Sequence, residues 1–547
     1  MNIKSLFGLS LLAAAITACD GGGVTLAPSN NVENSNNTTN NGGDNGDSGS
    51  NENPCASYTV SGQVIQGAFS GGNCTYSNTF VSDTRPLTED LVINALENDG
   101  LHIFEDSLFV GEDVNANSVA QGVRIPQDGE GPKLTIGAGS KIAFFNSEDY
   151  VRISRGSRII AEGTRNNPII FSAVADLRDG SATEADRGLW GGMQINGNGL
   201  TNKCTDADRQ ATANNPHSCN VTAEGRPATY GGNNNAENSG VLRYVQIRHA
   251  GFEVVDGDEL NGLTLNAVGS GTTLENVQVY TTQDDGFEMF GGAVDLKNVV
   301  AVNVGDDSLD FSEGWTGDVQ FALIVQTSGS NRCIEADNTG DSQPDNIAPY
   351  TKGRVSNMTC ITSNVDTNEG TAPSSKGDAE GPLYREGSYF ELYNSIITSN
   401  ADGMSSNECL EVTSDQTIAG MNSGISAASG NIIACTEALK SSEIDLPAFW
   451  ANGNAVVENS ANLPANVIEG LSSSNKTAYV TASNLQDANG AAINVQVFDV
   501  TTLEDSFAAD AAPAVGSAGS SSFYESVDFV GAVKAGNDWV SGWTTGL

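Results

Sequence analysis

Two acidic turns that lie 22 residues apart constrain the fold of this chain more than any other feature. Asp284-Asp285-Gly286-Phe287-Glu288 is followed at that interval by Asp306-Asp307-Ser308-Leu309-Asp310. The register extends outside the turns, since Asn276-Val277 precedes the first turn as Asn298-Val299 precedes the second. Short β-branched runs separated by Gly, Asn and Asp turns at such a period are typical of a solenoid, in which each coil buries its apolar side against the next. We therefore predict an all-β fold, a single-stranded parallel β-helix.

Stacked coils would bring the acids of the two turns within about 4.8 Å of each other, the spacing of paired strands. Carboxylates at that distance repel each other unless they share protons or a cation. Calcium takes about six to eight oxygen ligands, so it is the candidate cofactor. Because side chains alternate along a strand, we expect Asp285 and Asp307 to share one side and Asp284 and Asp306 the other, so that only some of the acids converge. The candidate metal ligands are Asp284, Asp285, Glu288, Asp306, Asp307 and Asp310. The alternative is a set of solvated or buried, hydrogen-bonded acids without metal.

A second stretch, from Asp337 to Asp345, has oxygen-bearing side chains at alternating positions. It lacks the glycine and the final glutamate of an EF-hand loop, so an acidic surface loop is the favoured interpretation. The chain has only three histidines and no Cys/His spacing typical of zinc, which disfavours a zinc centre. Its 68 acids against 25 bases give a net charge of −43, which excludes nucleic acid as an expected partner.

The first residues indicate export. Lys4 is followed by an apolar segment from Leu6 to Ile16 that is too short to span a bilayer, which is typical of a secretory signal. The segment ends in Ile16-Thr17-Ala18-Cys19, which resembles the lipobox of bacterial lipoproteins, where the cysteine is acylated. An ordinary signal peptide with an incidental cysteine is the alternative. The resemblance implies a lipid anchor in the cell envelope, in the outer membrane, or in the inner membrane because of Asp20.

We expect five segments along the chain. Residues 1–19 form the signal peptide, 20–54 an Asn/Gly/Ser-rich disordered tether, 55–100 an N-terminal cap, 101–440 the β-helix and 441–547 a C-terminal cap. Trp450, Trp539 and Trp543 would supply apolar surface that covers the last coil. Two polar insertions, 176–188 and 200–239, interrupt the coils and form either a binding rim or decorated turns without a ligand.

Eight cysteines remain after Cys19, an even number that indicates disulfides in an exported protein. Neighbours in the sequence are separated by 19, 15, 27 and 26 residues. The last two separations are about one coil each, so we expect these pairs to join adjacent coils, and the second pair to close a local loop. The cysteines are Cys55 and Cys74, Cys204 and Cys219, Cys333 and Cys360, and Cys409 and Cys435.

Several runs of the chain carry a family resemblance: Leu134–Phe171, Trp190–Gly192, Tyr230–Gly232, Ser239–Val245, Asn261–Leu265, Val268–Thr272, Asp284–Gly292, Val527–Ala532 and Asp538–Thr544. Through them the chain, from about residue 85 to 547, resembles a family of exported Gram-negative lipoproteins that is similar in fold to pectate-lyase-type right-handed parallel β-helices. The resemblance implies a right-handed coil. It leaves the activity open, because β-helices host lyases, hydrolases, adhesins and caps.

Two functions fit these observations. A lipid-anchored β-helix that binds a glycan or an outer-membrane partner without cleaving it is the preferred hypothesis, with aromatic residues such as Trp190 as stacking surfaces. A polysaccharide lyase or glycoside hydrolase is the alternative, since a lyase needs a base and a cation beside the substrate carboxylate. The basic candidates near the acidic coils are Arg243, Arg248, His249 and Lys297.

Overall fold

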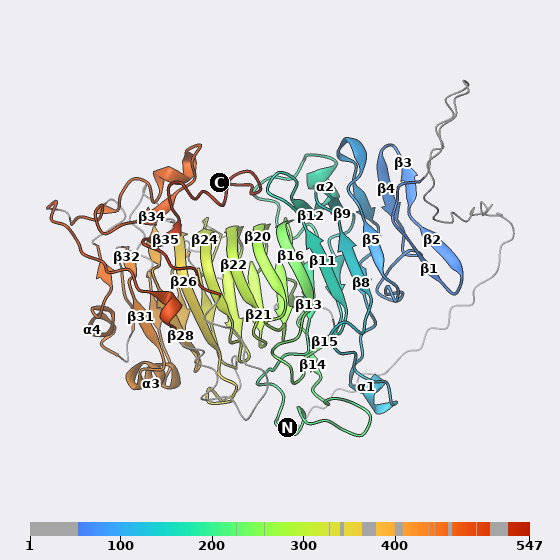
Figure 1. Cartoon of the computed structure of the whole chain (residues 1–547), viewed down its shortest axis with the longest axis horizontal. Coiled ribbons are helices and arrows are strands. Elements are labelled where there is room, and N and C mark those ends of the chain that lie inside the picture. The colour runs from blue at the N-terminus through green and yellow to red at the C-terminus, as the bar shows by residue number, and fades with distance from the viewer. Residues whose placement is uncertain are drawn as a thin grey trace, which may run out of the picture. The chain divides into compact units, whose positions relative to one another are not determined.

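Parallel strands, stacked coil on coil, form the body of this computed structural model (Figure 1). The residues from Asn53 to Leu547 form one unit. The structure describes residues 53–225, 227–255, 258–327, 329–339, 344–363, 379–399, 408–435, 437–441, 444–457, 462–487, 489–503 and 523–547. The predicted signal peptide, Cys19, Asp20 and nearly all of the predicted tether lie outside these residues.

One face of each coil belongs to a sheet of nine parallel strands. Phe287 pairs with Leu309 and Glu288 with Asp310, so the predicted 22-residue repeat is one turn of the coil. The strands are, in order, β7 (Leu108–Val110), β10 (Tyr150–Ile153), β13 (Gly192–Asn196), β19 (Leu263–Asn266), β21 (Phe287–Phe290), β23 (Leu309–Ser312), β25 (Glu335–Ala336), β27 (Leu383–Tyr384) and β30 (Glu411–Val412).

The other two faces come from long strands that bend at one residue. The long strands are β16 (Gly240–Arg248), β20 (Thr273–Thr282), β22 (Asp295–Val304), β24 (Asp318–Val325) and β26 (Lys352–Thr362). At the bend each has a residue with positive φ, between 50° and 63°, a conformation that asparagine tolerates better than most residues. The pairing stacks these corner residues in one row, which consists of Tyr244, Asn276, Asn298, Phe321 and Asn357. We call the segments before and after the corner the first and second arms.

The same eighteen-stranded sheet contains shorter strands at both ends of the coil stack. Between β11 and β12 a loop of residues 163–168 replaces the single corner residue, because Glu162 pairs with Arg243 and Ile169 with Val245. The shorter strands are β3 (Ala68–Ser70), β4 (Asn73–Tyr76), β5 (Leu91–Ile93), β6 (His102–Phe104), β8 (Lys133–Ile136), β9 (Lys141–Phe144), β11 (Arg158–Glu162), β12 (Ile169–Ala173), β28 (Tyr389–Tyr393), β29 (Ile396–Ser399), β31 (Ala427–Ser429), β32 (Ile432–Ala434) and β33 (Ala455–Val456).

The apolar core fills the interior of the coils. Leu263, Phe287 and Leu309 are stacked on one another in the nine-stranded sheet and have no exposed surface. Val277 and Val299 form a matching row in the second arms. Since side chains alternate along a strand, the residue next to each of these points outward, which places Glu288 and Asp310 on the outer face of the nine-stranded sheet.

Antiparallel hairpins and short helices decorate the stack. β1 (Ser57–Val60) pairs with β2 (Gln63–Gln66), whereas β4 already pairs in parallel with β6, so the parallel ladder reaches into the segment predicted as a cap. None of the helices among the described residues is long and apolar enough to cross a membrane. The helices are α1 (Ala116–Ala120), α2 (Val174–Leu177), α3 (Asp415–Ser423) and α4 (Leu446–Trp450), with 3-10 turns η1 (Glu97–Asp99), η3 (Glu469–Ser472) and η4 (Val500–Thr502).

The larger predicted insertion packs against the coils through a buried arginine. The Arg155 guanidinium donates to the carbonyl oxygens of Val114, Cys219 and Gly231 at 2.6–3.1 Å. A guanidinium has five charge-assisted N–H donors and suits this role, because each carbonyl oxygen that accepts a hydrogen bond from it fixes a different loop. The insertion contains a hairpin of β14 (Val221–Thr222) and β15 (Thr229–Tyr230), and a second hairpin of β17 (Glu253–Val255) and β18 (Asp258–Glu259) follows it.

All four expected cysteine pairs are disulfides. The expected geometry of the last two was wrong. Cys333 precedes β25 in the nine-stranded sheet, and Cys360 lies in β26, so this bond crosses the interior between two faces of one coil. The 27 residues that separate Cys333 from Cys360 make up part of one coil, which a loop lengthens. This number is close to the length of a whole coil, so the spacing alone wrongly indicated a bond between adjacent coils.

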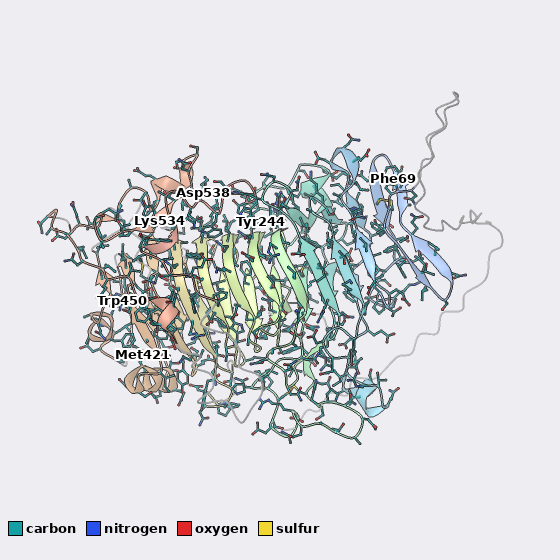
Figure 2. All side chains as sticks on the ribbon, viewed as in Figure 1. Phe69, Tyr244, Met421, Trp450, Lys534 and Asp538 are labelled. Carbon is teal, nitrogen blue, oxygen red and sulfur yellow. A yellow bond between two sulfur atoms is a disulfide. The ribbon has the colours of Figure 1, made fainter. Side chains whose placement is uncertain are left out.

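The C-terminal tryptophans do not all cover the last coil. Trp450, in α4, belongs to the interior core. Trp543 instead packs edge-on against Tyr244 in β16, with ring centroids 5.7 Å apart, and Trp539 joins the same outer cluster. Figure 2 shows Tyr244, Lys534 and Asp538 along one edge of the ladder and Trp450 near its end. Beside this segment, β34 (Ala478–Val480) pairs with β35 (Val530–Val533).

The corner row gives a test of the fold. Replacing Asn298 by valine should lower the free energy of unfolding by about 1–2 kcal/mol, because a β-branched residue resists positive φ. The Asn298→Gly variant should stay within about 0.5 kcal/mol of the wild type, since glycine adopts this conformation readily. Denaturant midpoints of the two variants measure the difference. Equal losses in both would contradict a backbone role for the corner.

Candidate metal centre

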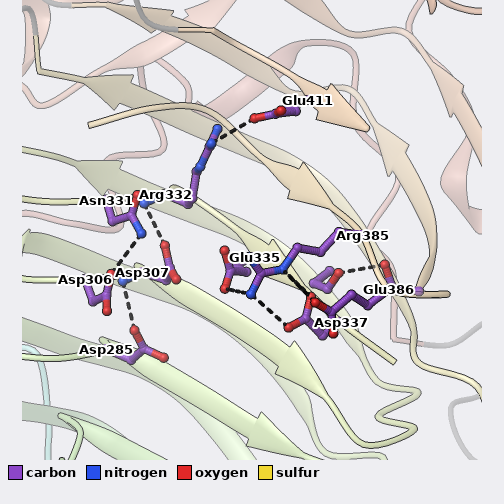
Figure 3. Close-up of polar contacts among 12 residues, drawn as sticks. Asp285, Asp306, Asp307, Asn331, Arg332, Glu335, Asp337, Arg385, Glu386 and Glu411 are labelled. Carbon is purple, nitrogen blue, oxygen red and sulfur yellow. Dashed lines mark hydrogen bonds and ion pairs between the residues drawn. The ribbon is translucent and has the colours of Figure 1, made fainter. Parts of the chain in front are cut away.

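A row of stacked acids follows the outer face of the nine-stranded sheet. The Asp307 N–H donates to Asp285 Oδ1 at 2.8 Å, and the Arg332 N–H donates to Asp307 Oδ1 at 2.7 Å (Figure 3). One coil earlier, the Asp285 N–H donates to Asn261 Oδ1 at 3.1 Å. Each side chain thus accepts a hydrogen bond from the backbone of the next coil, which holds equivalent residues in line. Asp285 and Asp307 lie on adjacent coils, as predicted.

Three overlapping groups of carboxylates lie along this row. Within each group the available oxygen atoms are all within 4.8 Å of one another. Asp285 belongs to the first two groups and Asp310 to the last two, so neighbouring groups share ligands. The groups are Asp284, Asp285 and Asp306; Asp285, Glu288 and Asp310; and Asp307, Asp310 and Glu335.

All six acids predicted from the sequence belong to these groups. The expectation that Asp284 and Asp285 would point to opposite sides was wrong, because both precede β21 and lie in the turn. Strand alternation does not apply to a turn, so consecutive side chains can reach one centre. Glu335 was not predicted as a member of these groups. The motif Cys333-Ile334-Glu335 recurs as Cys409-Leu410-Glu411, and both glutamates lie in the nine-stranded sheet.

Burial and mutual repulsion both disfavour ionisation of these acids. Burial raises the pKa of Asp285 well above its ordinary value, and the charges of Asp284, Asp310 and Asp306 raise it further. Burial also raises the pKa of Glu288, Asp307 and Asp310, with further increases from nearby carboxylates. Four carboxylates in such a site must hold protons or face a cation at neutral pH.

Two arginines neutralise only the far end of the row. Arg332 Nη2 lies 2.5 Å from Glu380 and 2.8 Å from Glu411, and Arg385 lies 2.8 Å from both Glu335 and Asp337. Burial raises the pKa of Glu335 to about 7 even though Arg385 opposes this shift. The second carboxylate group, around Asp285, has no arginine or lysine among its ion-pair partners in the described part of the chain.

Unsatisfied oxygen atoms lie beside the row. Asp310 Oδ1 and Ser312 Oγ are buried and have no hydrogen-bond partner among the described residues. Both residues belong to β23 and alternate with the interior residue Phe311, so they point to the same outer face. Buried polar atoms are nearly always hydrogen-bonded or ligated, and hard oxygen donors are the ligands that Ca²⁺ takes. The residues present therefore fit a calcium ion.

The basic residues predicted to assist catalysis lie on the other sheet. Arg243 in β16 pairs with Glu162 and Glu275, and Arg248 in the same strand lies 3.6 Å from Asp176. His249 Nδ1 lies 2.7 Å from the Asp186 carbonyl oxygen. Lys297 in β22 lies 2.8 Å from Glu525. The structure does not bring these residues to the acids.

Trp190 is not available as a stacking surface. It is fully buried, its ring lies parallel to Phe144 at 4.6 Å, and its Nε1 donates to the Arg248 carbonyl oxygen at 2.7 Å. Its large apolar area therefore stabilises the interior. In the second acidic stretch, from Asp337 to Asp345, Asp337 pairs with Arg385, and residues 340–343 lie outside the described part of the chain.

The raised pKa values predict a pH dependence. Burial raises the pKa of Glu335 to about 7 and that of Glu380 to about 8, whereas a glutamate in the unfolded chain has a pKa of ~4.3. Above pH ~4.5 the folded chain therefore holds protons that the unfolded chain has released, so its stability falls as pH rises through these values. In chelator, the thermal midpoint should fall by several degrees between pH 5 and pH 8. A midpoint that rises over this range would contradict the shifts.

The comparisons with known proteins agree with this architecture. A family described as a pectate-lyase-like β-helix domain matches residues 127–544. No curated protein and no solved structure matches the chain. The matched range contains the row of acids, the bent strands and the C-terminal segment that packs on them. The chain therefore belongs to the pectate-lyase-like β-helix family.

Proposed function

We propose that this chain is a calcium-binding lipoprotein of the cell envelope whose β-helix binds a glycan or an outer-membrane partner without cleaving it. In this proposal the helix is right-handed and both ends are capped. The observation that carries the proposal is the set of three overlapping carboxylate groups on adjacent coils, which share Asp285 and Asp310.

Charge supports a cation in this place. The first two groups contain five different acids, buried or nearly so, and the bases near them pair with acids further along the ladder. Carboxylate oxygens from two coils would coordinate a bound Ca²⁺, which would remove the repulsion between these carboxylates. The ion would then fasten neighbouring coils at the outer face, where a ligand has access to partly exposed Asp306 and Asp310.

In this proposal Cys19 carries the lipid anchor. The outer membrane is the proposed location, and the inner membrane is the alternative because of Asp20. An acylated cysteine before a long polar tether would hold the β-helix away from the bilayer. Metabolic labelling with a radioactive fatty acid should mark the wild type and leave the Cys19→Ala variant unlabelled. Labelling of both the wild type and the variant, or of neither, would contradict a lipid anchor at Cys19.

A cleaving enzyme is the second candidate, and the family match is the observation that favours it. Paired carboxylates are also what glycosidases use. The structure places His249, Arg243 and Lys297 on a different sheet from the acids, so the base and cation proposed for a lyase are not assembled. This arrangement favours binding over elimination.

Metal content tests the calcium site. Purified protein dialysed against Ca²⁺ should retain at least one ion per chain in elemental analysis, and Ca²⁺ should raise the thermal midpoint at pH 8 relative to chelator. The Asp285→Asn variant should melt higher than wild type in chelator, because a repulsive charge is gone, and should lose most of the calcium-dependent increase.

Glu89→Gln is the matched control, because Glu89 is exposed and its replacement by glutamine removes one negative charge, as Asp285→Asn does. It should leave the calcium-dependent increase unchanged. An unchanged midpoint in excess chelator, or an equal effect of the two substitutions, would contradict the calcium site.

A glycan array followed by a turnover assay separates the two candidate functions. The binding hypothesis expects saturable retention of one glycan class in Ca²⁺ with no new reducing or unsaturated ends. Product that forms in proportion to enzyme concentration, and is lost in Asp285→Asn, would favour the enzyme instead.

A further inference from the structure

The C-terminal residues 523–547, here called the strap, lie across the corner row, with Glu525 on the first arms and Trp543 and Thr545 on the outer face of the second arms. In Figure 1 the chain end labelled C lies near β24 and β20, far along the ladder from α4. The contacts agree: Trp543 reaches β16, Thr545 reaches β20 and Glu525 reaches β24. The strap thus crosses several coils without pairing with their strands, apart from the β34–β35 hairpin that it forms with an earlier segment.

Side-chain carboxamides on the coils hold the strap backbone in reciprocal pairs. Gln278 donates to the Thr545 carbonyl oxygen at 2.7 Å and accepts from the Thr545 N–H at 2.9 Å. Gln320 makes the same two bonds with Glu525, at 2.9 and 2.8 Å. A carboxamide has the donor and acceptor of a peptide group, so each pair reproduces one rung of a β-ladder.

Outward-facing apolar residues complete the surface. Val300 and Leu323 occupy the outer row of the second arms and are fully buried, in one cluster with Val540 and Trp543 of the strap and with Leu471 and Ala478 of the preceding segment. This cluster is separate from the interior core that fills the coils. The interior would remain filled without the strap, whereas this outer face would become an apolar patch.

Two charge contacts fix the direction of the strap. Lys297 Nζ lies 2.8 Å from Glu525, and Arg165 Nε donates to the Ser541 carbonyl oxygen at 2.6 Å. The basic residues come from different coils, so a reversed strap would lose both contacts. Partly exposed ion pairs of this kind weaken in salt.

We propose that the outer face of the bent strands, on both sides of the corner row, is a polypeptide-binding surface, and that the strap is its ligand and can exchange for a free peptide of the same sequence. The partner class is an extended segment with backbone amides placed for Gln278 and Gln320 and an indole placed for the patch beside Tyr244. Recognition of this kind reuses the chemistry of strand addition, with glutamine side chains in place of a strand edge.

A full-length chain with a protease site inserted after Leu503 tests this proposal. After cleavage, the C-terminal fragment should co-elute with the rest of the chain, and a fluorescent peptide of residues 523–547 should displace it in a saturable manner, measured by anisotropy. The Gln278→Ala/Gln320→Ala variant and a peptide with Trp543→Ala should each weaken binding at least tenfold.

Gln63→Ala is the matched control, because Gln63 is an exposed glutamine on β2, and it should bind the peptide as the wild type does. The β signal in circular dichroism should persist while the fragment exchanges. Loss of that signal on release, no exchange over days, or equal binding by all variants would overturn the proposal and show that the strap is an integral part of the fold.

Discussion

Parallel pairing between successive coils is the constraint on which the rest of this structure depends. It places residue 285 beside 307 and residue 277 beside 299, so every property of one coil is repeated next to itself. Apolar side chains stacked in this way make a continuous interior. Acids stacked in this way create repulsion that the fold alone does not relieve. The core and the candidate metal centre are therefore two consequences of one register.

The sequence predicted the parts of the structure that follow from this register. The 22-residue interval was enough to place Asp285 and Asp307 on adjacent coils, and cysteine parity with short separations was enough to pair all eight cysteines. The residue types and their spacing were also sufficient to identify acids that lie close together, because carboxylates in successive equivalent turns must meet in a solenoid.

The remaining features depend on contacts that the repeat does not encode. Loops lengthen some coils, so the spacing of Cys333 and Cys360 gave no indication of which faces they join. Glu335 reaches Asp310 only after a coil of 25 residues, outside the 22-residue pattern. One signal was present and was not used: Val299-Val300-Ala301-Val302 is apolar at consecutive positions, which is typical of a strand covered on both faces and indicates the strap.

The row of left-handed corners also determines where the chain can vary in length. Between β11 and β12 six residues stand where β16 has one, and both arms still pair in register with their neighbours. A segment of foreign sequence grafted into this exposed loop would emerge between two faces and leave the hydrogen-bonded rows undisturbed, whereas the corners at Phe321 and Asn357 are buried against the strap. The same graft within an arm would shift every residue after it to the wrong side of the sheet. The loop between β11 and β12 thus makes this molecule a scaffold for the display of a foreign peptide.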